Sequence, residues 1–314
     1  MDVLERRCYF LLPLLVVLMT ATASQAKQLY KFQDEDGRWQ YTDIAPATDQ
    51  PVQSHPVRVA QKDKIIVSSR GPDAEHELYI YNSYYGPVEV ILNFTQAKNV
   101  VAQPALPHRF VIPARREIRA VDLKVADKAR GFDYKITVSP LLGDSKAQHD
   151  PRIAYRVPFD SGKTFAVTQG FFGGYSHNTP YSEYAVDIAM PEGTPIVAAR
   201  GGVVMDIERD FFGNGLDMEK YGARANSVRI LHDDGTMAEY AHLKLESVRV
   251  LPGTRVIAGQ PLGESGNTGF SSGPHLHFAI HKNQGTEMRS LPFQFRLYDD
   301  TLVSPRTGLS LTGY

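Results

Sequence analysis

Cysteine is almost absent from this chain of 314 residues, since the single one is Cys8. A lone cysteine excludes an internal disulfide. Because Cys8 lies in an N-terminal segment that we expect to be removed, the mature chain also lacks a catalytic thiol and a cysteine-ligated metal. Any metal ion must therefore be held by histidine, aspartate or glutamate, and this ligand set suits zinc in a catalytic site.

An excess of charge of one sign is also lacking, because 34 lysines and arginines face 35 acidic residues. Neither a nucleic-acid partner nor a disordered acidic tail is indicated. The apolar run Cys8–Met19 is short for a membrane span, which needs about 20 residues. It follows Arg6 and Arg7 and precedes small residues that end at Ala26. Residues 1–26 are therefore predicted to be a cleaved signal peptide, which implies a periplasmic or cell-envelope protein with no membrane span after cleavage.

The composition favours a mainly β protein, since 25 glycines, 20 prolines and 16 tyrosines suit strands and turns better than long helices. Residues 27–50 predict a β-hairpin module around the turn signal Asp36-Gly37. This module resembles a hairpin of unknown function found at the N-termini of many bacterial envelope proteins. Residues 51–148 predict a β-sandwich domain, because strand candidates recur at short intervals once a proline-bearing linker over 45–64 has ended. Residues 149–314 predict an antiparallel β-sheet domain, which holds every candidate functional residue.

The segment 273–281 carries the strongest chemical signal, with His275 and His277 ahead of apolar residues of high strand propensity. Residues two apart in a strand face the same side, about 6.6 Å apart. One imidazole can then bind a metal while the other faces the water on it. Asp187 lies in an apolar strand candidate, where a buried carboxylate is costly unless a metal or another cation compensates its charge. His242 ends a further strand candidate, so these segments are expected to converge.

Four motifs that carry these residues occur in one order along the chain: Val186-Asp187-Ile188-Ala189-Met190-Pro191, Tyr240-Ala241-His242-Leu243, Gly266-Asn267-Thr268-Gly269 and Gly273-Pro274-His275-Leu276-His277. With them the chain resembles the lysostaphin/LytM-type zinc metalloendopeptidases, which cut the peptide part of bacterial peptidoglycan. The resemblance implies a small antiparallel β-sheet domain whose groove holds one Zn²⁺ ion. It also implies that Asp187 and His277 are zinc ligands and that His242 and His275 are catalytic histidines.

The third zinc ligand is where the chain departs from the family pattern. That pattern has a histidine four residues before the aspartate, and here the position is Glu183. In one hypothesis the upstream His177 is the ligand, and the residues between it and Asp187 loop out. In the other, Glu183 replaces the histidine or the metal is lost. We favour His177, because a second carboxylate on zinc would make the bound water less acidic.

The mechanism implied needs a proton acceptor, and the chain has no His-Glu-x-x-His helix to supply a glutamate base. A neutral histidine can accept the proton of zinc-activated water. We assign His275 as this base and His242 to orient the water or stabilise the oxyanion, with the reverse assignment also open. The other histidines of the domain, His232 in a predicted turn and His281, are expected to take no part, and His76 is expected at the surface.

The predicted function is an exported zinc metalloendopeptidase that hydrolyses peptide bonds of peptidoglycan stem peptides or cross-links. One alternative is a non-catalytic relative that binds peptidoglycan or activates a cell-wall amidase, and Glu183 is the hint of lost ligation. A second alternative is a protease with a protein substrate, which would use the same residues. Cell-division or amidase partners are not identifiable from the sequence.

Overall fold

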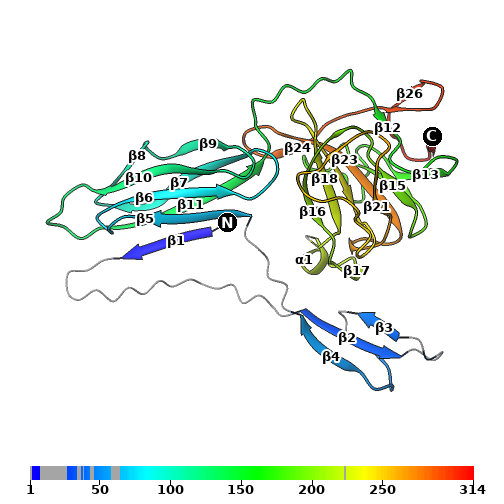
Figure 1. Ribbon diagram of the computed structural model, residues 1–314, viewed down its shortest axis with the longest axis horizontal. Coiled ribbons are helices and arrows are strands. Elements are labelled where there is room, and N and C mark those ends of the chain that lie inside the picture. Colours follow the sequence, from blue (N-terminus) through cyan, green and yellow to red (C-terminus); the bar gives the residue numbers. More distant parts are fainter. Residues whose placement is uncertain are drawn as a thin grey trace. The chain divides into compact units, whose positions relative to one another are not determined.

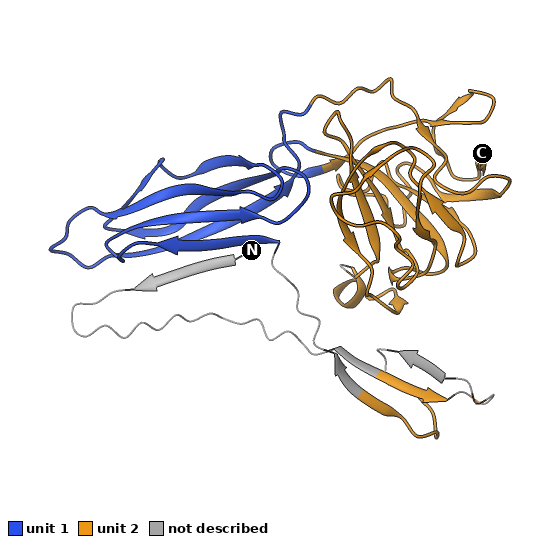
Figure 2. Cartoon of the chain, viewed as in Figure 1, with its two compact units in different colours: residues 1–22, 62–147, 283–288 blue, residues 23–61, 148–282, 289–314 orange. Residues whose placement is uncertain are grey.

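The computed structural model describes residues 2–7, 27–33, 37, 39–42, 46–57, 64–222 and 224–314. The chain divides into two compact units, of which unit 1 holds residues 1–22, 62–147 and 283–288 and unit 2 holds the remainder (Figure 2). Almost every described element is a strand, which confirms the mainly β fold (Figure 1). Helix α1, Met218–Tyr221, has four residues, and no helix in the described ranges is long and apolar enough to cross a membrane.

The predicted N-terminal segments are described in part. Of the predicted signal peptide, only β1 (Asp2–Arg7) is described, and residues 8–26 lie outside the described residues. Strands β2 (Lys27–Gln33) and β3 (Trp39–Thr42) pair antiparallel, as expected for the hairpin. A third strand, β4 (Gln53–Val57), pairs with β2 where the sequence predicts a linker. The sequence did not predict this strand, because its residues are mostly polar and include a proline. An edge strand tolerates proline.

Unit 1 contains two four-stranded antiparallel sheets. Their strand orders are β1–β11 (Asp133–Leu142)–β7 (Val88–Lys98)–β9 (His108–Ile112) and β5 (Ile65–Arg70)–β6 (Glu75–Asn82)–β10 (Glu117–Val125)–β8 (Val100–Gln103). Alternate residues of β6 are buried, among them Leu78 and Ile80. His76 shares their face, so the prediction that it lies at the surface is wrong. It is buried, with Nε2 2.6 Å from the Tyr134 hydroxyl.

Unit 2 is built on one antiparallel sheet. Its main path is β20 (Arg255–Val256), β16 (Gly202–Glu208), β18 (Ser227–Leu231), β19 (Met237–Ala241), β23 (His275–Asn283), β14 (Val186–Ala189), β13 (Thr164–Gln169) and β27 (Ser310–Thr312), with β24 (Met288–Ser290) paired to β23. Smaller sheets are β15 (Pro195–Val197) with β21 (Pro261–Glu264), β17 (Asn214–Gly215) with β22 (Gly269–Phe270), and β12 (Tyr155–Arg156) with β25 (Phe295–Arg296) and β26 (Leu302–Val303).

Strand β23 has one apolar face and one histidine face. Leu276, Phe278 and Ile280 are fully buried in the core of unit 2. Burying a large apolar side chain stabilises the fold by about 1.5–3 kcal/mol, so three of them on one face prevent the strand from turning over. His275 and His277 must therefore lie on the opposite face, which is the face that carries the candidate site.

Candidate metal centre

The register between β14 and β23 brings the first two candidate ligands together. Asp187 lies directly opposite His277 in this antiparallel pair, and Ala189 lies opposite His275. Directly opposite residues have Cβ atoms about 4.5–5.5 Å apart on the same face of a sheet. Asp187 Oδ1 is accordingly 2.8 Å from His277 Nδ1 and 3.8 Å from His275 Nε2.

His177 reaches the same place from the loop between β13 and β14. Its main-chain N–H donates to the carbonyl oxygen of Gly173, and its Nδ1 donates to that of Gly170 at 3.0 Å. The loop also closes around Gln169, whose Oε1 accepts the main-chain N–H groups of Tyr175 and Ser176. A Cβ atom at Gly173 would lie 2.1 Å from Gln169 Cγ, so only glycine allows this close approach.

Gln169 also fixes the carboxylate of Asp187. Its Nε2 donates to Asp187 Oδ2 at 2.9 Å, which leaves Oδ1 to face the two imidazoles. The sequence analysis missed this residue, because Gln169 ends an ordinary strand and belongs to no recognisable motif. A side chain that orients a ligating carboxylate is a usual part of metal sites.

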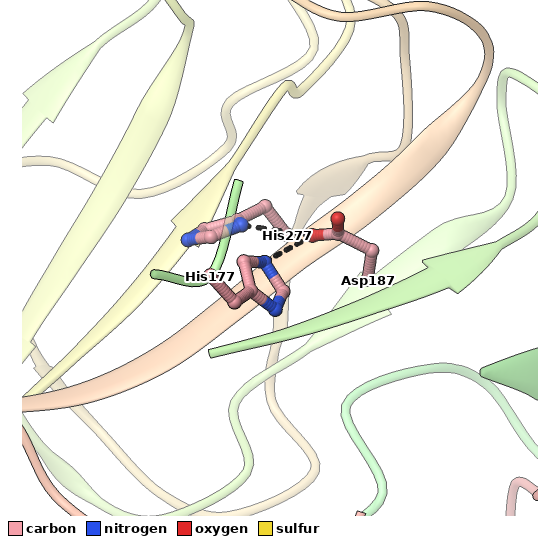
Figure 3. Close-up of side chains that lie close together, drawn as sticks. All are labelled: His177, Asp187 and His277. Atoms are coloured by element: carbon pink, nitrogen blue, oxygen red, sulfur yellow. Dashed lines mark hydrogen bonds and ion pairs between the residues drawn. The ribbon is translucent and has the colours of Figure 1, made fainter. Parts of the chain in front are cut away.

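One nitrogen each of His177 and His277 and one oxygen of Asp187 lie within 4.8 Å of one another. Figure 3 shows the three side chains pointing toward a common centre, with Asp187 from β14, His277 from β23 and His177 from the loop. Among the described residues this is the one group of three or more His, Cys, Asp or Glu side chains compact enough to hold a metal ion. Glu183, the alternative ligand, is not part of the group.

The chemistry of the donor atoms fits a cation. A carbonyl oxygen only accepts hydrogen bonds, so the bond to Gly170 puts the proton of His177 on Nδ1 and a lone pair on Nε2. This Nε2 is buried, has no hydrogen-bond partner among the described residues and lies 3.3 Å from Asp187 Oδ1. A lone pair facing a carboxylate is repulsive unless a cation lies between them. Ligands of tetrahedral zinc, at about 2.0–2.2 Å from the ion, are roughly 3.3–3.5 Å apart, which agrees with this separation.

The electrostatics of the group keep the carboxylate ionised. Burial raises the pKa of Asp187, but the hydrogen bond and charge of His277 lower it, and the pKa lies well below its ordinary value. Burial lowers the pKa of His277, but the hydrogen bond and charge of Asp187 outweigh burial, so this pKa is raised. Asp187 therefore carries a negative charge at neutral pH.

His242 and His275 flank the group and share one arrangement. Nδ1 of His242 donates to the carbonyl oxygen of Thr268 at 2.7 Å, and Nδ1 of His275 donates to that of Gly273 at 2.8 Å. Both imidazoles therefore carry their lone pair on Nε2. Their ring centroids are 4.6 Å apart, and the His242 centroid is 5.8 Å from that of His277.

Both flanking histidines are kept neutral. Burial lowers the pKa of His242 to about 3, with help from His275 and His277. Burial also lowers the pKa of His275, although Asp187 opposes this shift. His242 has a φ of +61°, a backbone conformation that residues other than glycine adopt rarely and often at functional sites. At neutral pH both Nε2 atoms can accept a proton or a hydrogen bond.

Two further histidines of the domain are buried away from this group. Nδ1 of His232 donates to the carbonyl oxygen of Gly201 at 2.8 Å. Nε2 of His281 donates to the carbonyl oxygen of Tyr181 at 2.9 Å. Neither imidazole belongs to the compact metal-binding group.

The C-terminal part of the chain matches known proteins. Residues 181–289 match the profile described as Peptidase family M23. The matched range contains four of the predicted site residues, Asp187, His242, His275 and His277, and His177 lies just before it.

Three relatives indicate how much of each protein is shared. Glycyl-glycine endopeptidase ALE-1 of Staphylococcus capitis is 34% identical over 116 residues, which are 36% of this chain and 29% of ALE-1. Lysostaphin of Staphylococcus simulans is 36% identical over 114 residues, 35% of this chain and 21% of lysostaphin. Peptidoglycan DD-endopeptidase ShyC of Vibrio cholerae is 39% identical over 105 residues, 32% of this chain and 21% of ShyC. The chain thus spans only a fifth to three tenths of the length of these curated relatives.

Proposed function

Because residues 181–289 belong to peptidase family M23, we propose that the protein is an exported zinc metalloendopeptidase that hydrolyses peptide bonds of peptidoglycan. The observation that carries the proposal is the convergence of His177, Asp187 and His277 on one centre, beside two neutral histidines. A non-catalytic relative would have lost part of this set. Here all five side chains are present and close together.

His177 Nε2, Asp187 Oδ1 and His277 Nδ1 would hold one Zn²⁺ ion. When bound with an open coordination position, zinc polarises a substrate carbonyl and makes water acidic enough to attack it near neutral pH. Gly170 and Gln169 contribute indirectly, because each fixes the orientation of one ligand. Two neutral imidazoles and one carboxylate also leave a net positive charge for the developing oxyanion.

His275 is the proposed general base. Its Nε2 is 3.8 Å from Asp187 Oδ1, which is close to the atoms that would ligate the metal. The bond from Nδ1 to Gly273 leaves the Nε2 lone pair available, and burial keeps the ring neutral. Once protonated on Nε2, the same ring can donate that proton to the leaving amine.

His242 is proposed to orient the attacking water, because its neutral Nε2 can accept a hydrogen bond from that water but has no proton to donate to an oxyanion. Its ring is held by Thr268 and lies next to that of His275, so the two side chains can act on neighbouring atoms of one substrate. Burial disfavours the charged form of His242 more clearly, which supports a hydrogen-bonding role over a proton-accepting role.

The substrate is proposed to be the peptide part of peptidoglycan. ShyC is named a peptidoglycan DD-endopeptidase, whereas ALE-1 is named a glycyl-glycine endopeptidase. A predicted signal peptide and an N-terminal module like those of bacterial envelope proteins suit a Gram-negative periplasm. We therefore favour the D-alanyl–diaminopimelate cross-link over a glycine bridge.

Digestion of purified sacculi tests the proposal. The zinc-loaded protein is incubated with Gram-negative sacculi, and the soluble products are separated and weighed by mass spectrometry. Conversion of cross-linked dimers to monomers is expected, with a denatured casein-type substrate left intact. Sacculi that stay intact in the presence of stoichiometric zinc would contradict the proposed activity, and cleavage of casein alone would indicate a protein substrate.

A further inference from the structure

The loop that carries His177 has no regular secondary structure. Residues 170–185 form only turns and bends between β13 and β14. A strand holds its side chains through the ladder of the sheet, as β14 and β23 hold Asp187 and His277. The position of His177 depends instead on whatever fixes the loop, and residues 178–186 separate it from Asp187.

Tyr181 fixes the far side of this loop. Its hydroxyl donates to Glu239 Oε2 at 2.8 Å and accepts from Arg229 Nη2 at 3.0 Å. Its main-chain carbonyl accepts from His281 Nε2 at 2.9 Å, and the two rings stack at 4.1 Å with an interplanar angle of 25°. The loop thus gains two hydrogen bonds to charged side chains and one to an imidazole through a single residue.

The side chains that contact Tyr181 all belong to strands of the main sheet. Arg229 of β18 and Glu239 of β19 are directly opposite each other and form an ion pair at 2.6 Å. Burial raises the pKa of Glu239, but Arg229, His281, His277 and the Tyr181 hydroxyl together outweigh burial and leave the pKa at about 2, so the carboxylate stays charged. His281 is on β23 and shares the face of His277. Tyr181 therefore ties the loop to the same strand that holds another ligand of the group.

Ser290 of β24 makes a second, independent attachment beside Tyr181. Its main-chain N–H and its hydroxyl both donate to the carbonyl oxygen of Pro180, at 2.9 and 3.2 Å. Its hydroxyl oxygen accepts the main-chain N–H of Tyr184 at 3.0 Å. The two attachments hold adjacent residues of the loop on β23 and β24.

We propose that Tyr181 is a positioning residue for the metal ligand His177, acting through its hydroxyl on the Arg229–Glu239 pair. This inference rests on the proposed function, because it concerns the same metal centre. Without the hydroxyl the loop loses two of its hydrogen bonds to the sheet, those to Glu239 and Arg229. His177 is then held less firmly and must give up more freedom when the metal binds. Metal affinity then falls although all three ligands are intact.

The test measures zinc affinity by competition with a chromophoric chelator, in the full chain, for wild type, Tyr181→Phe and a control. Tyr298→Phe is the control, because it removes a hydroxyl from an exposed tyrosine outside the site. Removing a group that orients a metal ligand usually weakens affinity about 10–100-fold. Tyr181→Phe is expected to bind zinc about tenfold more weakly and Tyr298→Phe to bind as wild type. Excess zinc should restore turnover of sacculi by Tyr181→Phe, which a general loss of structure would not allow.

Wild-type zinc affinity in Tyr181→Phe would overturn the positioning role and leave the proposed function standing. A failure of excess zinc to restore turnover would also overturn it, because the defect would then lie elsewhere. Should Tyr181→Phe not fold, Glu239→Gln carries the test, because it removes the charged acceptor of the Tyr181 hydroxyl and leaves Tyr181 itself in place, with the same expected loss of affinity. If the wild-type protein binds no zinc at all, the proposed function itself fails, and that result is distinct from the other outcomes.

Discussion

Replacing His177 by alanine is expected to remove zinc from the protein, whereas the same replacement at Glu183 is expected to leave zinc bound. The two residues lie in one loop, so each variant is a matched control for the other. The main-chain N–H of Glu183 donates to Thr179 and its carbonyl oxygen accepts from Phe172. Alanine keeps both bonds, and the loop is therefore expected to keep its shape in Glu183→Ala.

The magnitude follows from the number of ligands. Structural zinc sites with four protein ligands bind with about 10–16 kcal/mol, which is roughly 2.5–4 kcal/mol for each ligand. Each 1.4 kcal/mol changes a binding constant tenfold, so loss of one ligand is expected to weaken affinity by about 10²–10³. Nε2 of His177 is buried and has no hydrogen-bond partner among the described residues, so no other protein group competes with zinc for it. His177→Ala is therefore expected to lose the whole contribution of this ligand to zinc affinity.

Zinc content after dialysis against a weak chelator, followed by calorimetric titration of zinc into each variant, measures the difference. Zinc affinity is expected to be the same in wild type and Glu183→Ala, and far lower in His177→Ala. A His177→Ala protein that binds zinc as tightly as wild type would refute the ligand assignment. Loss of zinc in Glu183→Ala alone would show that the carboxylate takes the place of the histidine.

Three further predictions concern the other titratable groups. Asp187→Ala and His277→Ala should each lose both zinc and turnover, as shown by metal analysis and sacculus digestion; zinc retained by either would contradict its role. His275→Ala and His242→Ala should keep zinc while the rate falls about 10²–10⁴-fold, the usual contribution of a general acid or base, and zinc loss in either would instead make it a ligand. Burial lowers the pKa of His232 to about 4, below its ordinary value of 6.5, so protonation favours the unfolded chain and stability falls as pH drops from 6.5 toward 4. At pH 4.5 this protonation costs about 2–3 kcal/mol of stability. In metal-free protein, His232→Gln should therefore make the urea midpoint depend less steeply on pH. An unchanged slope would disprove the role given to His232.

Strand alternation was enough to predict which side chains share a face. In β23 the apolar residues Leu276, Phe278 and Ile280 are one residue out of step with His275 and His277, and this pattern is local in the sequence. The same parity, applied to β6, would have predicted that His76 is buried. There the sequence analysis expected His76 at the surface because it lies outside the domain of the candidate site, and the prediction was wrong.

Contacts that depend on how the loops close were beyond sequence analysis. Gln169 orients Asp187, and Tyr181 attaches the loop of His177, but neither residue belongs to a periodic pattern or a motif. Their contacts join residues 18 and 58 positions apart through loop geometry, which alternation does not encode. The carbonyl groups of Thr268 and Gly273, which set the tautomers of both flanking histidines, are invisible in a sequence for the same reason.

Anomalous diffraction from zinc-loaded crystals, recorded on both sides of the zinc absorption edge, tests the central claim most directly. A single strong anomalous peak is expected within about 2.0–2.2 Å of His177 Nε2, Asp187 Oδ1 and His277 Nδ1. A peak ligated by Glu183, a peak remote from Asp187, or no peak at stoichiometric zinc would contradict the account.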